Sequence, residues 1–150
     1  MMEPDQILFE IVERGYIQST SADLVIGFSR QWDVSIGRAL TECHIVPELE
    51  FARWMSEILE LRLIEGLALE QIDMEASQMI PFGVALEKEI LVLHPDQESG
   101  KLALVSDPTD RETLETIQAY LGGHVDLGLA ERSEIRRMVL QVYPMMSGSG

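Results

Sequence analysis

Two short aliphatic runs joined by a turn-forming segment constrain the fold of this chain more than any other feature. The runs are 90–93 (ILVL) and 102–105 (LALV), and the segment 94–100 between them contains Pro, Asp, Ser and Gly. Residues of these types favour turns, so the pattern predicts a β-hairpin. Because both runs are almost continuously apolar, each strand is expected to have protein on both faces. Helices are therefore required to flank the hairpin.

Amphipathic helices are predicted on the N-terminal side of the hairpin. Apolar residues recur at helical spacing over 5–14, 21–32, 35–41 and 46–61, which is typical of helices that bury one face. In the second helix the predicted buried stripe consists of Leu24, Val25, Phe28 and Trp32. These segments predict that residues 1–61 form a helical lobe.

The remaining segments predict a small sheet with helices around it. Residues 63–67 are expected to form a first strand, and residues 125–129 an edge strand because apolar and polar residues alternate there. Further helices are predicted at 73–78, 82–87, 107–121 and 132–142, the third of them starting at Ser106-Asp107-Pro108. Asp107 and Asp110 are predicted to be the capping groups of that helix.

The whole pattern predicts an α+β fold with a helical N-terminal lobe followed by a small mixed β-sheet flanked by helices. The helical lobe spans 1–61, and an α/β lobe with the hairpin at its centre spans 62–144. Residues 145–150 end in Ser-Gly-Ser-Gly, a composition typical of linkers, so they are predicted to form a flexible tail.

The charge of the chain restricts its possible partners. It carries 26 acidic residues against 11 Lys and Arg, for a net charge of −15. Such a surface repels nucleic acid phosphates and anionic lipid headgroups, so a basic protein surface is the expected partner. No apolar run reaches the ~20 residues that span a bilayer, and the N-terminal MMEPDQ is acidic. A cytoplasmic protein without direct membrane insertion is expected.

No cluster of residues in the sequence predicts catalysis or a metal site. A GxxxxGK[ST] phosphate loop is absent, so no ATP hydrolysis is expected. His44, His94 and His124 are far apart in sequence, and the single Cys43 cannot form an internal disulfide. The chain is predicted to be a non-enzymatic module without a cofactor or metal.

Several motifs in this order resemble a known family. Ile80-Pro81 precedes the first hairpin strand, Asp107-Pro108 follows the second, and the closing helix reaches Tyr143. This arrangement resembles the N-terminal domain of type II secretion and type IV pilus assembly ATPases. The resemblance implies a non-catalytic docking or regulatory module ahead of an ATPase motor domain. It also implies docking on the cytoplasmic domain of an inner-membrane platform protein, which would hold the chain at the periphery of that membrane.

One branch of that family binds cyclic di-GMP through two tandem copies of a motif that starts with Arg-Leu-Gly. Matched to this sequence, the motif implies five candidate ligand-binding positions: Ile7, Gly15 and Gln31 in the first copy, and Ile36 and Gly37 in the second. The motif arginine is missing from both copies, which removes much of the attraction for an anionic dinucleotide. Loss of nucleotide binding is therefore expected, and a cyclic di-GMP sensor remains the alternative function.

The partner is expected to bind the helical lobe. Glu50 and Glu57 flank Trp54 on the predicted helix that starts near residue 46, so an apolar anchor could be surrounded by acidic groups. Burial of Trp54 in the core is the alternative interpretation. A second candidate surface is the final helix, which gathers Arg132, Arg136 and Arg137 on one side.

Overall fold

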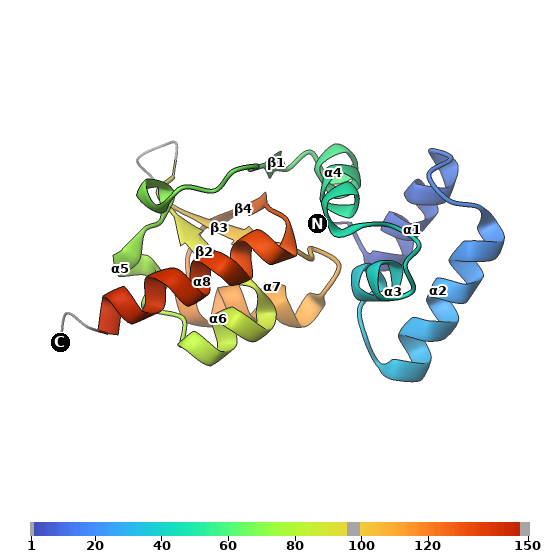
Figure 1. Ribbon diagram of the computed structural model, residues 1–150. Coiled ribbons are helices and arrows are strands. Elements are labelled where there is room, and N and C mark those ends of the chain that lie inside the picture. Colours follow the sequence, from blue (N-terminus) through green and yellow to red (C-terminus); the bar gives the residue numbers. More distant parts are fainter. Residues whose placement is uncertain (1, 96–99, 148–150) are drawn as a thin grey trace.

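The structure is a computed structural model that describes residues 2–95 and 100–147, and it contains two lobes that lie side by side (Figure 1). The helical lobe consists of α1 (Pro4–Glu13), α2 (Ser19–Trp32), α3 (Ile36–Glu42) and α4 (Glu48–Leu59). All four lie close to their predicted positions. The helical pattern is therefore a reliable guide to where these elements are.

The second lobe is built on a four-stranded mixed sheet in the order β1-β4-β3-β2. Its strands are β1 (Arg62–Leu63), β2 (Ile90–Leu93), β3 (Lys101–Val105) and β4 (Val125–Leu129). The hairpin is confirmed, because β2 and β3 pair antiparallel with Leu91 opposite Leu104, and both strands are buried almost throughout. Residues 96–99 of the predicted turn lie outside the described residues.

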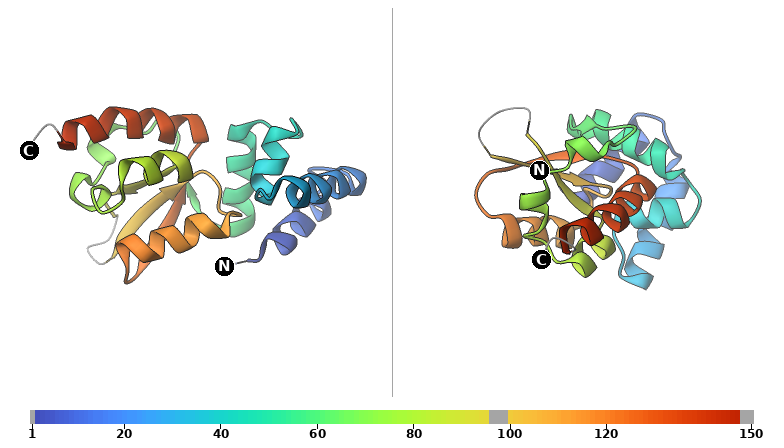
Figure 2. Two further views of the ribbon diagram at one scale, coloured as in Figure 1. Left: turned by 90° about the horizontal axis from the view of Figure 1, so that it is seen from below. Right: turned by 60° about the vertical axis from the view of Figure 1, so that its left-hand side comes forward.

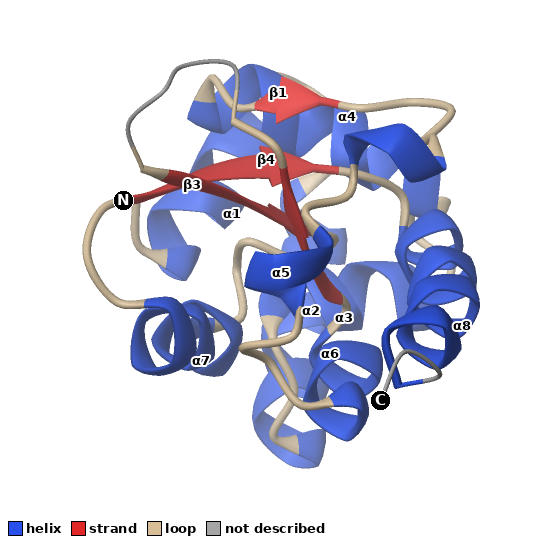
Figure 3. Ribbon diagram, turned by 90° about the vertical axis from the view of Figure 1, so that its left-hand side faces the viewer, coloured by secondary structure: helices blue, strands red, loops and turns tan. Residues whose placement is uncertain are grey.

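Helices cover both faces of this sheet, as the apolar strands require. Figures 2 and 3 show α7 (Arg111–Leu121) on one side, and α6 (Phe82–Lys88) with α8 (Arg132–Ser147) on the other. A 3₁₀ turn at Leu69–Gln71 and the short α5 (Met74–Ser77) lead into α6. The α+β fold class is therefore confirmed.

Two strand predictions need correction. The first strand covers only Arg62–Leu63, not 63–67, because it pairs only with Gly128 and Leu129 of β4. β4 was predicted to be an edge strand but lies between β1 and β3, parallel to both. Because β1 is short, the first part of β4 has no strand neighbour on that side among the described residues.

The predicted flexible tail is wrong for residues 145–147, because α8 continues to Ser147 through Pro144. Packing around Tyr143 holds this last part of the helix. The Tyr143 hydroxyl lies 2.9 Å from the carbonyl oxygen of Ser77 and 2.8 Å from that of Ile80, and its ring contacts Phe82. Burial raises the pKa of Tyr143 to about 12.

The buried stripe predicted for α2 is wrong in part. Ala22 and Val25 are buried, but Leu24 is 70% exposed and Trp32 is 61% exposed. The buried side chains of the two lobes nevertheless belong to one continuous core, which includes Ile7 and Met55 as well as Leu104 and Ile135. The predicted boundary at residue 61 remains a prediction, although α4 ends at Leu59 and β1 begins at Arg62.

Candidate functional site

A hydrogen-bonded joint connects the two lobes. Ser35 caps the N-terminus of α3 by accepting a hydrogen bond from the Arg38 amide at 3.0 Å, and its hydroxyl donates to the Asp107 carboxylate. Asp107 follows β3 directly and also accepts from the amide of Thr109 at 3.0 Å. The Thr109 hydroxyl in turn accepts from the amide of Gly37 at 2.8 Å. The loop after β3 therefore fixes the start of α3.

Asp107 and Asp110 were both predicted to be helix-capping groups, and the prediction is confirmed for Asp110 and wrong for Asp107. The helix begins at Arg111, where Asp110 is the N-cap and accepts a hydrogen bond from the Glu112 amide. Asp107 is used for the joint instead. Burial raises the pKa of its carboxyl, while hydrogen bonds from Ser35 and Thr109 act in the opposite direction.

Close packing at Gly37 belongs to the same joint. A Cβ atom at this position would lie 2.6 Å from the ring of Phe51 and within hard contact of Asp107. Any side chain would therefore push α3 away from the loop after β3. The structure thus explains a glycine here by contact between the lobes.

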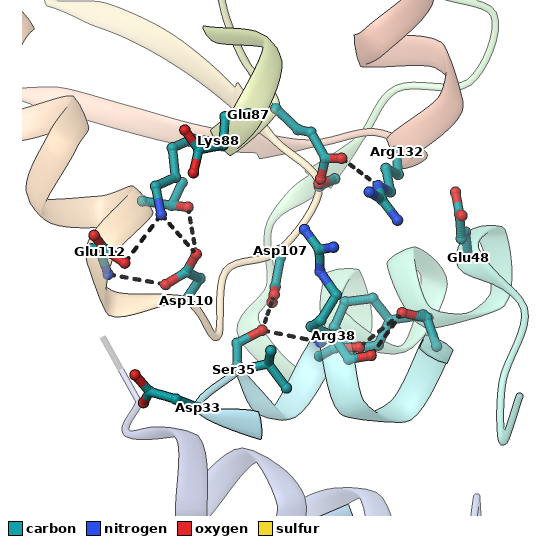
Figure 4. A pocket seen from close by; sticks show the side chains of 17 residues that line it. Asp33, Ser35, Arg38, Glu48, Glu87, Lys88, Asp107, Asp110, Glu112 and Arg132 are labelled. Atoms are coloured by element: carbon teal, nitrogen blue, oxygen red, sulfur yellow. Dashed lines mark hydrogen bonds and ion pairs between the residues drawn. The ribbon is translucent and has the colours of Figure 1, made fainter. Parts of the chain in front are cut away.

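A cleft of about 290 Å³ opens beside this joint (Figure 4). Its lining contains seven acidic and three basic side chains: Asp33, Glu48, Glu87, Glu89, Asp107, Asp110 and Glu112, with Arg38, Lys88 and Arg132. An excess of acidic groups in a concave site attracts cations. Arrangement and charge together make this cleft suitable for a basic group.

The cations of the cleft are already engaged. Lys88 contacts Glu112 at 3.1 Å and Asp110 at 3.9 Å, and the attraction of these carboxylates outweighs burial in raising the pKa of Lys88. Arg38 pairs with Glu42 at 3.3 Å. By contrast, the carboxylates of Asp33, Glu48 and Glu87 make no hydrogen bond or ion pair within 2–95 and 100–147. Glu87 and Glu48 attract the nearby Lys88 and Arg132 at longer range, but none of the three carboxylates has a direct partner within those ranges.

The arginines of the final helix do not form a free basic surface. The buried Glu89 carboxylate accepts hydrogen bonds from Arg132 and from Ser106, and Arg136 lies 3.7 Å away. Arg136 also donates to the Leu86 carbonyl at 3.1 Å. Arg132 and Arg136 therefore hold α8 against the end of α6.

The structure places the five candidate nucleotide-binding residues in different surroundings. Ile7 and Ile36 are buried in the core, and Gly37 is part of the joint. Gly15, with φ +76°, and Gln31 are exposed near opposite ends of α2.

The candidate partner-binding residues on α4 differ in exposure. Trp54 is only 8% exposed and stacks on Tyr16 with ring centroids 5.0 Å apart, which agrees with the alternative of burial. Tyr16 donates a hydrogen bond to Glu57, and this bond raises the pKa of Tyr16. Glu50 lies 3.5 Å from Arg53. Both glutamates reach solvent, but the tryptophan does not form an exposed anchor.

Reasoning from sequence missed the joint and the cleft. Asp107-Pro108 was noted as specific to the family, and this was the one available signal.

Within the described ranges, no helix is long and apolar enough to cross a membrane. No group of His, Cys, Asp and Glu in those ranges is arranged to hold a metal ion.

Comparison with known proteins gives the context of this fold. The structure of MshE with cdg (cyclic di-GMP) superposes with a TM-score of 0.71 at 17% identity, covering 91% of this chain and 98% of that chain. The N-terminal domain of XpsE gives a TM-score of 0.66 at 14% identity, covering 94% and 96%. Another crystal form of that domain gives 0.57 at 18% identity, covering 93% and 96%. No curated protein matches.

A family comparison covers the sheet lobe. The model of the MshEN domain matches residues 59–149, which include the hairpin, the Asp107 loop and α8. The match is consistent with the resemblance to N-terminal domains of secretion and pilus ATPases. The chain belongs to the MshEN domain family.

Proposed function

We propose that this chain is a non-catalytic docking and regulatory module of a type II secretion or type IV pilus assembly ATPase system, and that it binds a protein partner. The observation that carries the proposal is the shared fold, which extends over 94% of this chain in the comparison with the N-terminal domain of XpsE. A module of this kind acts by positioning a motor domain, so its own contribution is a binding surface.

The proposed partner is the cytoplasmic domain of an inner-membrane platform protein, or the ATPase motor domain itself. The net charge of −15 favours a basic surface on that partner. Glu50 and Glu57 on α4 are proposed to contribute to this attraction, with Trp54 supporting them from beneath. Electrostatic attraction between exposed groups is screened by salt, so association is expected to slow as salt rises.

A binding titration tests the proposal. The purified chain is mixed with the platform protein's cytoplasmic domain at low and high salt, and ATP hydrolysis by the chain alone is assayed in parallel. Salt-sensitive binding without hydrolysis is expected. Glu50→Lys/Glu57→Lys should weaken binding by about tenfold, whereas the matched charge change Glu70→Lys/Glu115→Lys on the sheet lobe should not. Absence of binding to both the platform domain and the motor domain would contradict the proposal.

Cyclic di-GMP sensing is the second candidate function. It is favoured by the likeness to the MshE structure with cdg, at a TM-score of 0.71. Its candidate residues remain Ile7, Gly15, Gln31, Ile36 and Gly37. Calorimetry with cyclic di-GMP separates the two functions: no heat at micromolar concentrations is expected for the docking module, and a clear titration would favour the sensor.

A further inference from the structure

An apolar stripe on α2 is only partly covered within the described structure. Leu24, Phe28 and Trp32 follow one another at i, i+4 and i+8, so they lie along one side of the helix. Leu24 is 70% and Trp32 61% exposed, Phe28 is half-buried, and the rings of Phe28 and Trp32 lie 6.2 Å apart. Ala22 and Val25 pack into the lobe. The apolar side of α2 is therefore wider than the part that the lobe covers.

A bare patch of backbone borders this stripe. Gly27 has nothing within 4 Å of the position of a Cβ atom, and it lies three residues after Leu24 in the same helix. A glycine in a helix interior costs about 1 kcal/mol relative to alanine. It also allows a second helix to approach the backbone closely, as small residues do at helix-packing interfaces.

The acidic cleft begins, in sequence, where the stripe ends. Asp33 directly follows Trp32, adopts a left-handed conformation with φ 52°, and lines the cleft with Glu48 and Glu87. Figure 4 shows these three carboxylates coming from different segments around the opening. The basic residue of α2, Arg30, lies two positions from both Phe28 and Trp32, which is roughly 200° around the helix. The stripe therefore borders acidic groups at its C-terminal end.

We propose that this stripe (Leu24, Phe28 and Trp32) and the adjoining cleft form one docking surface for an amphipathic helix whose apolar face ends in Lys or Arg side chains. The apolar face covers the stripe, and the basic side chains reach Asp33, Glu48 and Glu87. Extended apolar surface on a soluble protein marks an interaction site. A second copy of the chain fits poorly, because two molecules of charge −15 repel each other. The inference rests on the proposed function in that the partner is a protein.

The test uses a synthetic amphipathic helical peptide with Leu on one face and Lys at its end, and a matched peptide with Glu in place of Lys. Binding is measured by fluorescence anisotropy of the labelled peptides. The Leu/Lys peptide should bind and the Leu/Glu peptide should not. Leu24→Ser/Trp32→Ser should weaken binding about tenfold or more, whereas the matched control Leu140→Ser, which changes an exposed leucine on α8, should change it less than about twofold.

A separate variant tests how much the charges of the cleft contribute to peptide binding. Asp33→Asn/Glu87→Gln removes two charges, and Asn tolerates the left-handed conformation of residue 33. The salt dependence of peptide binding should become shallower while the variant stays folded by circular dichroism. Equal loss of binding in Leu24→Ser/Trp32→Ser and Leu140→Ser, or an unchanged salt dependence in Asp33→Asn/Glu87→Gln, would overturn the inference.

Quenching of tryptophan fluorescence by acrylamide locates the bound peptide. Trp32 is exposed and Trp54 is buried, so the accessible emission comes mainly from Trp32 and should be absent in Trp32→Phe. The Leu/Lys peptide should protect this emission. Protection by cyclic di-GMP in place of the peptide, or a dimer in sedimentation that Leu24→Ser/Trp32→Ser disrupts, would overturn the proposed occupant.

A parallel titration with the platform protein's cytoplasmic domain separates this inference from the proposed function. If that domain binds and Leu24→Ser/Trp32→Ser does not weaken it, the docking surface is wrong and the proposed function stands. If that domain and the motor domain fail to bind, but the Leu/Lys peptide binds through the stripe, the proposed function fails and the docking surface stands.

Discussion

Helices α2 and α8 have similar amphipathic patterns but are covered to different extents. In α8 four apolar residues of one side are buried against the sheet and α6, namely Ile135, Met138, Val139 and Val142, while Leu140 is exposed on another side. In α2 only Ala22 and Val25 are buried. A sheet offers a broad surface to a helix, whereas the neighbours of α2 contact a narrower part of it. Periodicity thus identifies the apolar side of a helix, but the tertiary contacts decide how much of that side is buried.

The largest effect should come from the covered helix. Ile135→Ala removes a fully buried side chain and leaves a cavity under α8, so the free energy of unfolding should fall by about 2–5 kcal/mol. Denaturant unfolding followed by circular dichroism measures it. A loss below about 1 kcal/mol would mean that α8 is packed as loosely as α2, and the comparison would fail.

The sequence predicted the positions of the helices and strands better than it predicted which of them lie next to one another. The hairpin and the helices were recognisable because periodicity and turn residues are local signals. The two-residue β1 and the interior position of β4 depend on pairing between distant segments, so local pattern could not predict them. The same limit applies to Leu24 and Trp32, whose exposure depends on where α2 sits in the lobe.

The candidate site was predicted less well for the same reason. Asp107 has the local signature of a helix cap, yet it accepts hydrogen bonds from Ser35 and Thr109. Ser35 lies more than seventy residues away in the sequence. Gly37 was singled out by its position in a nucleotide-binding motif, whereas the structure shows it packed at the joint. Nothing in the sequence indicated that these residues lie together in the fold.

The close contact between α3 and the loop after β3 can be tested at Gly37. Gly37→Ala places a methyl group against Phe51 and Asp107, so it should lower the free energy of unfolding by about 1–3 kcal/mol. Alanine has a higher helix propensity than glycine, so helix propensity does not explain a loss. Gly27→Ala on exposed α2 is the matched control and should be neutral or stabilising. Equal effects of the two substitutions would contradict the close packing.

A smaller and pH-dependent effect is expected at Asp107. Burial raises the pKa of this carboxyl in the folded protein, so its contribution to stability is fully present below the unfolded pKa and is lost as pH rises through the folded pKa. Asp107→Asn lacks this titration and should change stability by about 1 kcal/mol through altered hydrogen bonds.

Chemical denaturation of wild type and Asp107→Asn across the acidic to neutral range measures this effect. The stability of wild type relative to the variant should decrease as pH rises. Asp110→Asn, at the N-cap of α7, is the control for loss of a carboxylate that does not connect the lobes. A relative stability that increases with pH would show that the hydrogen bonds to Asp107 outweigh its burial.

The smallest effect on stability should come from the uncovered helix. Leu24→Ala removes a side chain that is 70% exposed and introduces a better helix former, so the free energy of unfolding should change by less than about 0.5 kcal/mol. The same denaturation measurement used for Ile135→Ala applies. A loss comparable to that of Ile135→Ala would show that Leu24 is buried in solution, and α2 would then resemble α8. If stability is unchanged while binding of a partner helix is weakened, the leucine serves a contact outside the chain.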